Sequence, residues 1–192
     1  MLRLFIALTP DEAVKEALAE VQERLRQRLP ARTVKWTPPE QIHLTLRFLG
    51  DVPEDAVAGL TDALAHAAAG QRSFELIAER LGVFPTLRRP RVLWVGLGGG
   101  LRELTAVQQA LQNATAPWGA REEKDFHAHL TLGRVRELAP ARLREVAAAL
   151  LEFRVDRLGS WTASAVELFR SELRPDGAVH TCLASQRFGA AT

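Results

Sequence analysis

The 192-residue sequence predicts an α+β fold with antiparallel strands, organised as two related halves. Helical and strand-like segments alternate irregularly, without the regular strand–helix repeat that a parallel sheet requires. Turns rich in proline and glycine separate three pairs of expected strands, which favours antiparallel hairpins. The tetrapeptide His-Leu-Thr-Leu also occurs twice, at residues 43–46 and 129–132, and each copy precedes a proline and an Ala/Leu-rich stretch. We interpret this recurrence as an internal two-fold duplication.

Hydrophobic periodicity and breaker residues define the expected elements in chain order. They are strand 2–8, helix 10–28, strand 32–36, strand 42–49, helix 53–69, strand 73–81, strand 91–97, helix 101–116, strand 128–135, helix 140–151, and strands near 160–170 and 178–188. No linker or low-complexity segment divides the chain, so we expect a single domain, residues 1–192.

The first strand is a short apolar run that ends at Thr9-Pro10-Asp11-Glu12, where the threonine is expected to cap a helix that the proline opens. The run is too short for a signal peptide and is typical of a buried strand. No apolar run in the sequence is long enough to span a bilayer. We therefore expect a cytoplasmic protein that does not contact membranes.

Proline also opens the second and fourth expected helices, at Pro53 and Pro140. The run Gly96-Leu97-Gly98-Gly99-Gly100, before the third helix, lacks the glycine spacing of a dinucleotide-binding fingerprint, so we interpret it as a turn. The expected hairpins join 32–36 to 42–49, 73–81 to 91–97, and 160–170 to 178–188.

The composition allows an anionic ligand without requiring one. The net charge is +2, and arginine supplies all the basic residues except Lys15, Lys35 and Lys124. Arginine binds phosphate in a bidentate manner, although an arginine-rich and alanine-rich composition is also typical of a GC-rich genome. The cluster Arg88-Arg89-Pro90-Arg91 fits either contact with a polyanion or a solvated turn, and the sequence assigns no role to its arginines or to Arg134.

Each His-Leu-Thr-Leu copy is expected to present a polar face and an apolar face. Residues two apart in a strand share a face, so His43 and Thr45 point one way while the two leucines point to the core. His129 and Thr131 follow the same pattern. Two such strands facing one cleft would bring two imidazoles and two hydroxyls together.

Neighbouring residues extend these faces. By strict alternation Arg47 and His127 share the polar faces and are candidate substrate-binding residues, and Gly133 leaves room there for a substrate. His66 lies in an alanine-rich helix and His180 in the last hairpin, and we expect both to be structural.

Three chemistries use paired histidines. A metal site could combine His127 and His129 with His43, although no carboxylate or cysteine stands at ligand spacing. A threonine nucleophile with a histidine base leaves the duplication unexplained. General acid–base catalysis at a phosphodiester explains it, because in-line displacement needs one group to take a proton and another, across phosphorus, to give one. With an ordinary pKa near 6.5, one histidine can be neutral while the other is protonated, and each threonine can donate to a phosphate oxygen.

These motifs make the chain similar to the 2H phosphoesterase superfamily, which is defined by two His-x-Thr/Ser-x motifs. It most closely resembles the RNA 2′,3′-cyclic phosphodiesterases, formerly called 2′-5′ RNA ligases. Many relatives have a proline immediately before the second histidine, where this chain has Ala128. The matching segments are 3–7, 34–36, 43–50, 82–85, 90–94, 127–134 and 168–171, together with Leu173, Pro175 and Gly177.

The resemblance implies a bilobal α+β fold, with two antiparallel sheets related by a pseudo-two-fold, helices on the outer faces, and a metal-independent, cofactor-free site between the sheets. It implies that His43 protonates the leaving 3′-oxygen and that His129 activates water, which yields a 2′-phosphomonoester. Thr45 and Thr131 correspond to the motif hydroxyls.

The expected partners are RNA ends or nucleotides carrying a 2′,3′-cyclic phosphate, and we expect the protein to be a monomer. The sequence leaves open whether reversible 2′-5′ RNA ligation accompanies hydrolysis. The alternative is a non-catalytic RNA-binding module that uses the same groove.

Overall fold

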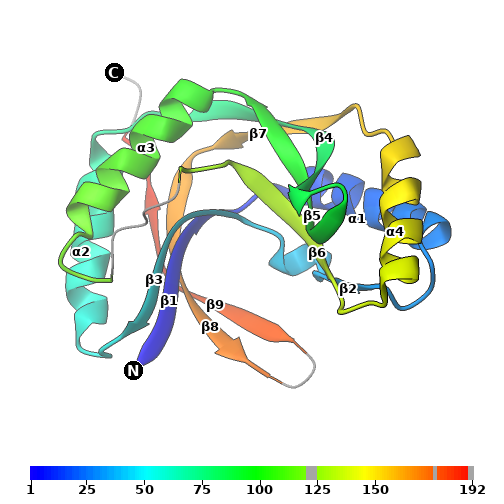
Figure 1. Ribbon diagram of the computed structural model, residues 1–192. Coiled ribbons are helices and arrows are strands. Elements are labelled where there is room, and N and C mark those ends of the chain that lie inside the picture. Colours follow the sequence, from blue (N-terminus) through cyan, green and yellow to red (C-terminus); the bar gives the residue numbers. More distant parts are fainter. Residues whose placement is uncertain (120–124, 175–176, 190–192) are drawn as a thin grey trace.

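The computed structural model describes residues 1–119, 125–174 and 177–189, and it confirms the α+β class (Figure 1). Strands and helices follow one another along these residues in an irregular order. The elements are β1 (Leu2–Leu8), α1 (Glu12–Arg28), β2 (Val34–Trp36), the short 3₁₀ helix η1 (Pro39–Gln41), β3 (Leu44–Val52), α2 (Ala56–Ala69), β4 (Phe74–Thr86), β5 (Arg89–Gly99), α3 (Leu101–Ala114), β6 (His129–Val135), α4 (Pro140–Glu152), β7 (Arg157–Ala163), β8 (Ala165–Leu173) and β9 (Ala178–Arg187).

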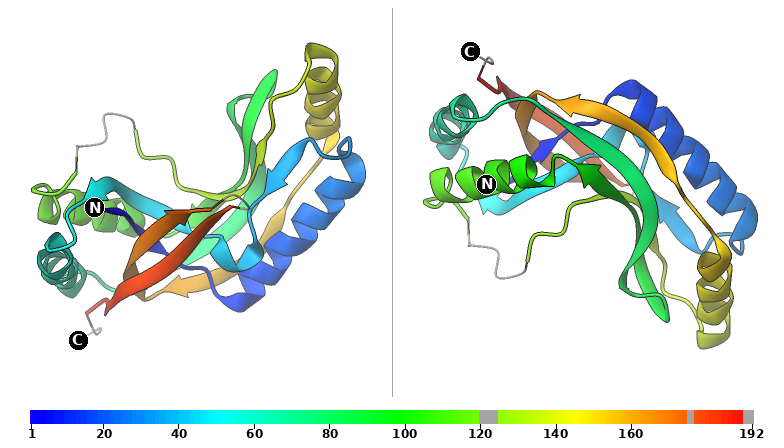
Figure 2. Two further views of the ribbon diagram at one scale, coloured as in Figure 1. Left: turned by 90° about the horizontal axis from the view of Figure 1, so that it is seen from below. Right: turned by 90° about the horizontal axis from the view of Figure 1, so that it is seen from above.

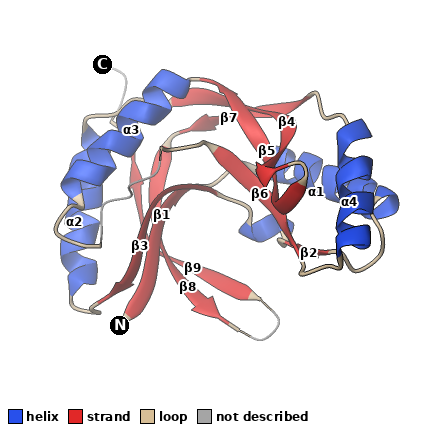
Figure 3. Ribbon diagram, viewed as in Figure 1, coloured by secondary structure: helices blue, strands red, loops and turns tan. Residues whose placement is uncertain are grey.

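The strands form two antiparallel sheets whose strand orders match (Figure 3). One sheet has the order β3-β1-β8-β9, and the other has the order β2-β6-β5-β4-β7. Thus β3 corresponds to β6, β1 to β5, β8 to β4 and β9 to β7, whereas β2 is an additional edge strand beside β6. This correspondence is the pseudo-two-fold that the repeated tetrapeptide predicts.

The helices cover the outer faces of both sheets. α2 contacts β8 and β9 and α3 contacts β3, while α1 contacts β7 and α4 contacts β5. Figure 1 shows α2 and α3 together on one side of the molecule and α1 and α4 on the other, and the views from below and above in Figure 2 agree. None of the described helices has the length and apolar content that a membrane span needs.

The apolar side chains of the first helix lie on one face, which is buried in the core. Asp11 caps α1 by accepting a hydrogen bond from the backbone N–H of Val14 at 3.0 Å. The predicted cap at Thr9 is wrong, because that hydroxyl donates instead to the carboxylate of Glu167 on β8. Side chains three or four residues apart form the buried stripe of the helix, each at most 1% exposed: Val14, Leu18, Val21 and Leu25.

One of the three expected hairpins is wrong, and the first strand of another has different bounds. β2 and β3 do not pair; β2 pairs with β6, and β3 pairs with β1. The intervening segment with η1 therefore carries the chain from one sheet to the other rather than through a tight turn. The expected strand near 160–170 is two strands in different sheets, because the chain crosses between the sheets at Ser164. The hairpin of β4 and β5 is confirmed, and β8 pairs with β9 as expected.

A one-residue bulge interrupts each motif strand immediately after its threonine. In β3, Thr45 pairs with Ala7 and Arg47 with Ile6, so Leu46 has no partner. In β6, Thr131 pairs with Trp94 and the residue after Leu132 pairs with Leu93, so Leu132 has none. A bulge of this kind inverts the alternation of the strand beyond it. The two residues after each bulge, Arg47 and Phe48 in β3 and Gly133 and Arg134 in β6, therefore lie on the faces opposite to those expected from strict alternation.

Gln22 of α1 supports the second bulge from the core. Its side chain is fully buried, and its Nε2 donates to the backbone carbonyls of Leu132 (2.8 Å) and Thr37 (2.7 Å). The Leu132 carbonyl also accepts from the backbone N–H of Thr37 at 2.9 Å. One glutamine thus ties α1 to the end of β2 and to the bulge in β6.

We expect Gln22→Leu to lower the free energy of unfolding by about 1–3 kcal/mol, because the substitution removes the hydrogen bonds from Gln22 to the carbonyls of Thr37 and Leu132. Urea unfolding would measure the change. Gln27→Leu is the matched control, since Gln27 is exposed on the same helix and should change stability by no more than about 0.5 kcal/mol. Equal unfolding midpoints for the two variants would contradict this role of Gln22.

Candidate active site

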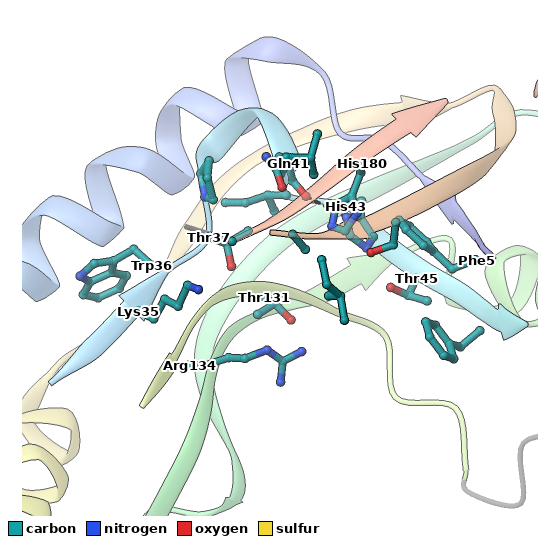
Figure 4. Close-up of a pocket in the computed structure, with 18 of the residues that line it drawn as sticks. Phe5, Lys35, Trp36, Thr37, Gln41, His43, Thr45, Thr131, Arg134 and His180 are labelled. Carbon is teal, nitrogen blue, oxygen red and sulfur yellow. Dashed lines mark hydrogen bonds between the residues drawn. The ribbon is translucent and has the colours of Figure 1, made fainter. Parts of the chain in front are cut away.

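A cleft of about 530 Å³ lies between the two sheets and contains both motifs (Figure 4). The lining comes from β1, β2, β3, β6, the β8–β9 hairpin and the segment before β3. The described lining residues are Arg3, Phe5, Lys35, Trp36, Thr37, Pro38, Gln41, Ile42, His43, Thr45, Phe48, His129, Thr131, Arg134, Ser171, Leu173, Gly177, Ala178, Val179 and His180.

The two motif histidines are held in the same way. Nδ1 of His43 lies 2.8 Å from the backbone carbonyl of Gln41, and Nδ1 of His129 lies 2.7 Å from the backbone carbonyl of His127. A carbonyl oxygen only accepts, so Nδ1 carries the proton in both rings when they are neutral. Each Nε2 is then left as the basic nitrogen.

Aromatic rings fix the planes of both imidazoles. The His43 ring stacks on Phe5 with a centroid distance of 4.6 Å. The His129 ring packs edge-on against Phe84 at 5.1 Å. The two histidines therefore sit against rigid apolar walls, which limits their rotation and also removes water from one side of each ring.

This burial shifts both titrations in the same direction. Burial lowers the pKa of His43 to about 4, with smaller contributions of the same sign from His180 and His129. Burial also lowers the pKa of His129, and the charge of Arg134 adds to this effect. The carbonyl bonds oppose both shifts without cancelling them. At neutral pH both imidazoles are therefore neutral in the protein without substrate.

The motif hydroxyls lie beside the histidines. Thr45 and Thr131 are half-buried and line the cleft, and within the described residues neither hydroxyl forms a hydrogen bond with another group. Figure 4 shows the two threonines on opposite sides of the cleft, one on β3 and the other on β6. Both hydroxyls are thus available as donors to a bound molecule.

The prediction that Arg47 lies on the cleft face is wrong. The bulge at Leu46 turns Arg47 to the core side, where it is 1% exposed and its guanidinium donates to the backbone carbonyls of Thr115 and Trp118 at 3.3 and 3.1 Å. The arginine joins β3 to the end of α3, which is a structural contact.

The predicted places of Gly133 and His127 also differ from those observed. Gly133 occupies the position in β6 that Arg47 occupies in β3, and a Cβ atom there would lie 2.7 Å from Cγ1 of Val34. The glycine therefore allows β2 to pack closely, and it leaves no room for a substrate. His127 is exposed and packs its ring against Trp94 at 4.9 Å, outside the cleft lining, while its carbonyl orients His129.

Several cleft residues escaped the sequence reasoning. The bulge at Leu132 turns the exposed Arg134 into the cleft, where strict alternation had placed Gly133. His180, expected to be structural, lies on the same wall as His43, with a centroid distance of 5.2 Å between their rings. The alternation of side chains along β9 does not predict that His180 lies in the cleft, because its position depends on how β9 is aligned with β8 in the sheet.

The described lining is cationic and contains no carboxylate. Arg3, Lys35 and Arg134 supply its permanent charges, and within the described residues none of them forms an ion pair. A cleft with cations and hydroxyl donors but without acids favours an anion. The arginines at 88, 89 and 91 are exposed around the β4–β5 turn and do not line the cleft.

The described residues do not form a ligand set for the metal site considered above. No three of their histidine, cysteine, aspartate or glutamate side chains are grouped so that they could hold a metal ion.

Comparison with known proteins identifies a family whose model covers both motifs. A family model described as "LigT like Phosphoesterase" matches residues 8–94 and 98–180, so each match contains one His-Leu-Thr-Leu copy. The RNA 2′,3′-cyclic phosphodiesterase of Methanothermobacter thermautotrophicus is 32% identical over 93% of this chain and 95% of its own length. The protein of that name from Thermus thermophilus is 34% identical over 95% of this chain and 88% of its own length.

Solved structures share the fold along their whole length. The protein TT0787 of Thermus thermophilus has a TM-score of 0.77 at 28% identity, and the match covers 99% of this chain and all of that one. E. coli LigT complexed with 3′-AMP also has a TM-score of 0.77, at 21% identity, over 97% of this chain and 98% of that one. By the two matches of the family model and by its curated relatives, the chain belongs to the LigT-like phosphoesterase family.

Proposed function

We infer that the protein is an RNA 2′,3′-cyclic phosphodiesterase, which hydrolyses the cyclic phosphate of RNA ends or nucleotides to a 2′-phosphomonoester. The observation that carries this inference is the pair of equivalent histidines, each fixed through Nδ1, in a cationic cleft whose described lining has no acid. Curated relatives from several organisms carry the same activity in their names.

The two histidines divide the proton transfers between them. Nε2 of His129 takes a proton from water, and the water oxygen forms the new bond to phosphorus. The bond from phosphorus to the 3′-oxygen breaks, and His43 gives that oxygen a proton from Nε2. The 2′-oxygen keeps the phosphoryl group, so the product is a 2′-phosphomonoester. The scheme uses one neutral base and one protonated acid on opposite sides of phosphorus.

The remaining cleft residues stabilise the charge that develops on the phosphate. Thr45 and Thr131 donate hydrogen bonds to its non-bridging oxygens, and Arg134 adds a permanent positive charge beside His129. The bound phosphate in turn raises the pKa of His43, because an opposite charge nearby favours the protonated imidazole. Substrate binding thereby supplies the acid that the free cleft lacks at neutral pH.

A non-catalytic RNA-binding module is the weaker candidate. Binding alone would not require two imidazoles with the same carbonyl bond at Nδ1, since cations and hydroxyls already supply affinity for phosphate.

We further propose that the protein acts in the cytoplasm as a monomer. We also propose that the same residues catalyse 2′-5′ ligation when a 5′-hydroxyl takes the place of water: it attacks the phosphorus of the cyclic phosphate, the bond to the 3′-oxygen breaks, and a 2′-5′ phosphodiester forms.

We expect His43→Ala and His129→Ala each to lower turnover of a nucleoside 2′,3′-cyclic phosphate by at least about a hundredfold, because each removes a positioned acid or base. Steady-state kinetics, with circular dichroism as a check of folding, would measure this. His66→Ala is the matched control, since His66 lies on α2, outside the cleft lining. Near-normal turnover in either motif variant would overturn the scheme, and loss of wild-type activity on chelation with recovery by zinc would instead favour a metal site.

We expect Thr45→Ala and Thr131→Ala to raise the activation free energy by about 1–3 kcal/mol each, since each removes a hydrogen bond to a charged group. Replacement by serine keeps the hydroxyl and should restore most of the activity. The quantity to measure is kcat/KM for the cyclic phosphate. Silent alanine variants would mean that the hydroxyls do not contact the phosphate.

The lowered pKa values predict where activity depends on pH. kcat/KM reports the free protein, which must have His43 protonated and His129 neutral. His43 loses its proton above about pH 4 and His129 gains one below its own lowered pKa, so only a minor fraction of the free protein has this form. Because both pKa values lie below 6.5, kcat/KM should pass through a maximum in the acidic range and fall on either side of it. The alkaline limb of kcat should lie at higher pH, because bound phosphate raises the pKa of His43.

Profiles of kcat and kcat/KM across the acidic and neutral range would measure this displacement, with both limbs assigned to the coupled pair. A kcat/KM that keeps rising above neutral pH would contradict the assignment.

A further inference from the structure

β2 breaks the two-fold correspondence of the sheets at one end of the cleft. The motif strand β3 is the edge of its sheet, whereas β6 is followed by β2. The floor of the cleft therefore extends by one strand, about 5 Å, beyond the second motif and not beyond the first. Any ligand that reaches past the reacting phosphate meets protein on this side.

The extension places two cations directly opposite each other. Lys35 of β2 pairs with Arg134 of β6 in the register of the sheet, and both are exposed lining residues of the cleft. Figure 4 shows both side chains on the same side of the cleft, away from Phe5 and Thr45. Like charges at directly opposed positions repel. No carboxylate in the described lining relieves this repulsion.

The opposite wall of the cleft has an aromatic residue at the position that corresponds to Arg134. The residue of β3 that corresponds to Arg134 is Phe48, which is 37% exposed and has the guanidinium of Arg3 over its ring at 4.7 Å. Within the described residues, no strand beyond it corresponds to β2. The paired cations are thus confined to one end of an otherwise symmetric cleft.

The two cations stand at different depths relative to the reacting group. Arg134 is near enough to His129 to lower its pKa, and Lys35 is one strand further out. One phosphate held by the histidines and Arg134 leaves the Lys35 ammonium for another anion. In an RNA strand the anions are the backbone phosphates, one for each nucleotide. The anion nearest to the reacting phosphate is therefore the next phosphate of the same strand.

We propose that Lys35 forms a second phosphate subsite, which binds the phosphodiester on the 5′ side of the terminal nucleotide and makes RNA ends better substrates than free cyclic nucleotides. This rests on the proposed function. RNA then leaves the cleft over β2, and Lys35 is a specificity-determining residue rather than part of the acid–base pair.

The test compares the 2′,3′-cyclic phosphates of adenosine and of the dinucleotide ApA, using wild type and Lys35→Met. Wild type should have the higher kcat/KM for the dinucleotide. The variant should lose about tenfold or more on the dinucleotide, because it loses a hydrogen bond from a charged donor, and should lose much less on adenosine cyclic phosphate, which has no second phosphate. A dinucleotide with an uncharged methylphosphonate linkage should give wild type and variant the same rate.

Two further measurements separate this role from a structural one. Lys15→Met removes the same charge from α1, outside the cleft, and should leave both substrates unaffected. The slope of log(1/KM) against log salt for the dinucleotide should fall by about 0.7 in Lys35→Met, as expected for one phosphate contact on a single strand.

Equal losses on both cyclic phosphates, or no loss on the dinucleotide, would overturn the subsite. Wild type that cleaves neither substrate would refute the proposed function instead. In that case, calorimetry would measure the binding of the 3′-phosphates of adenosine and of ApA. Tighter binding of the ApA compound that is lost in Lys35→Met would support the subsite. Equal affinities of the wild type for the two compounds would refute it.

Discussion

The bulge one residue after each motif threonine determines which side chains face the cleft. Because one unpaired leucine inverts the alternation of β3 and of β6, Arg47 enters the core while Arg134 enters the cleft. The same inversion turns Gly133 toward β2, so that this strand can pack beside β6 and bring Lys35 into register with Arg134. The buried amide of Gln22 holds the carbonyl of the second bulge. The electrostatic character of the cleft thus depends on a local irregularity of the backbone that both halves share.

The sequence predicts the class, most elements and the four motif residues because these depend on local signals. Apolar periodicity, helix-opening prolines and a repeated tetrapeptide are all visible within a short window. The partners of β2 and β3 were wrong because strand pairing is decided between distant segments, and the Pro38-Pro39 turn looks the same whether it closes a hairpin or crosses between sheets. Arg47 was wrongly placed in the cleft, and Arg134 received no role, because a bulge leaves no signature in a single sequence. His180 joined the cleft through the alignment of β9 with β8, which no local pattern records.

The two halves are equivalent where protons are transferred and different where a substrate is recognised. Both histidines bond through Nδ1 to the carbonyl two residues earlier, so the backbone of each motif fixes its own ring. Around this core, one end of the cleft has Phe48 and Arg3 while the other has Lys35 and Arg134. Duplication supplies a matched pair of groups for an in-line reaction, and the unmatched strand β2 gives the cleft a direction. An asymmetric substrate such as an RNA end requires both properties.

The lowered pKa values and the cationic lining together determine when the catalytic acid forms. Burial against Phe5 and the absence of acids in the described lining keep His43 neutral at neutral pH, although the reaction needs it protonated. The charge of Arg134, which disfavours a charged imidazole at His129, also attracts a phosphate, and the bound phosphate favours the imidazolium of His43. The acid is then formed only when a substrate is in place, across the phosphate from the base His129. A cleft with a carboxylate beside His43 would hold the proton permanently, but it would also repel the phosphate on which the proton must act.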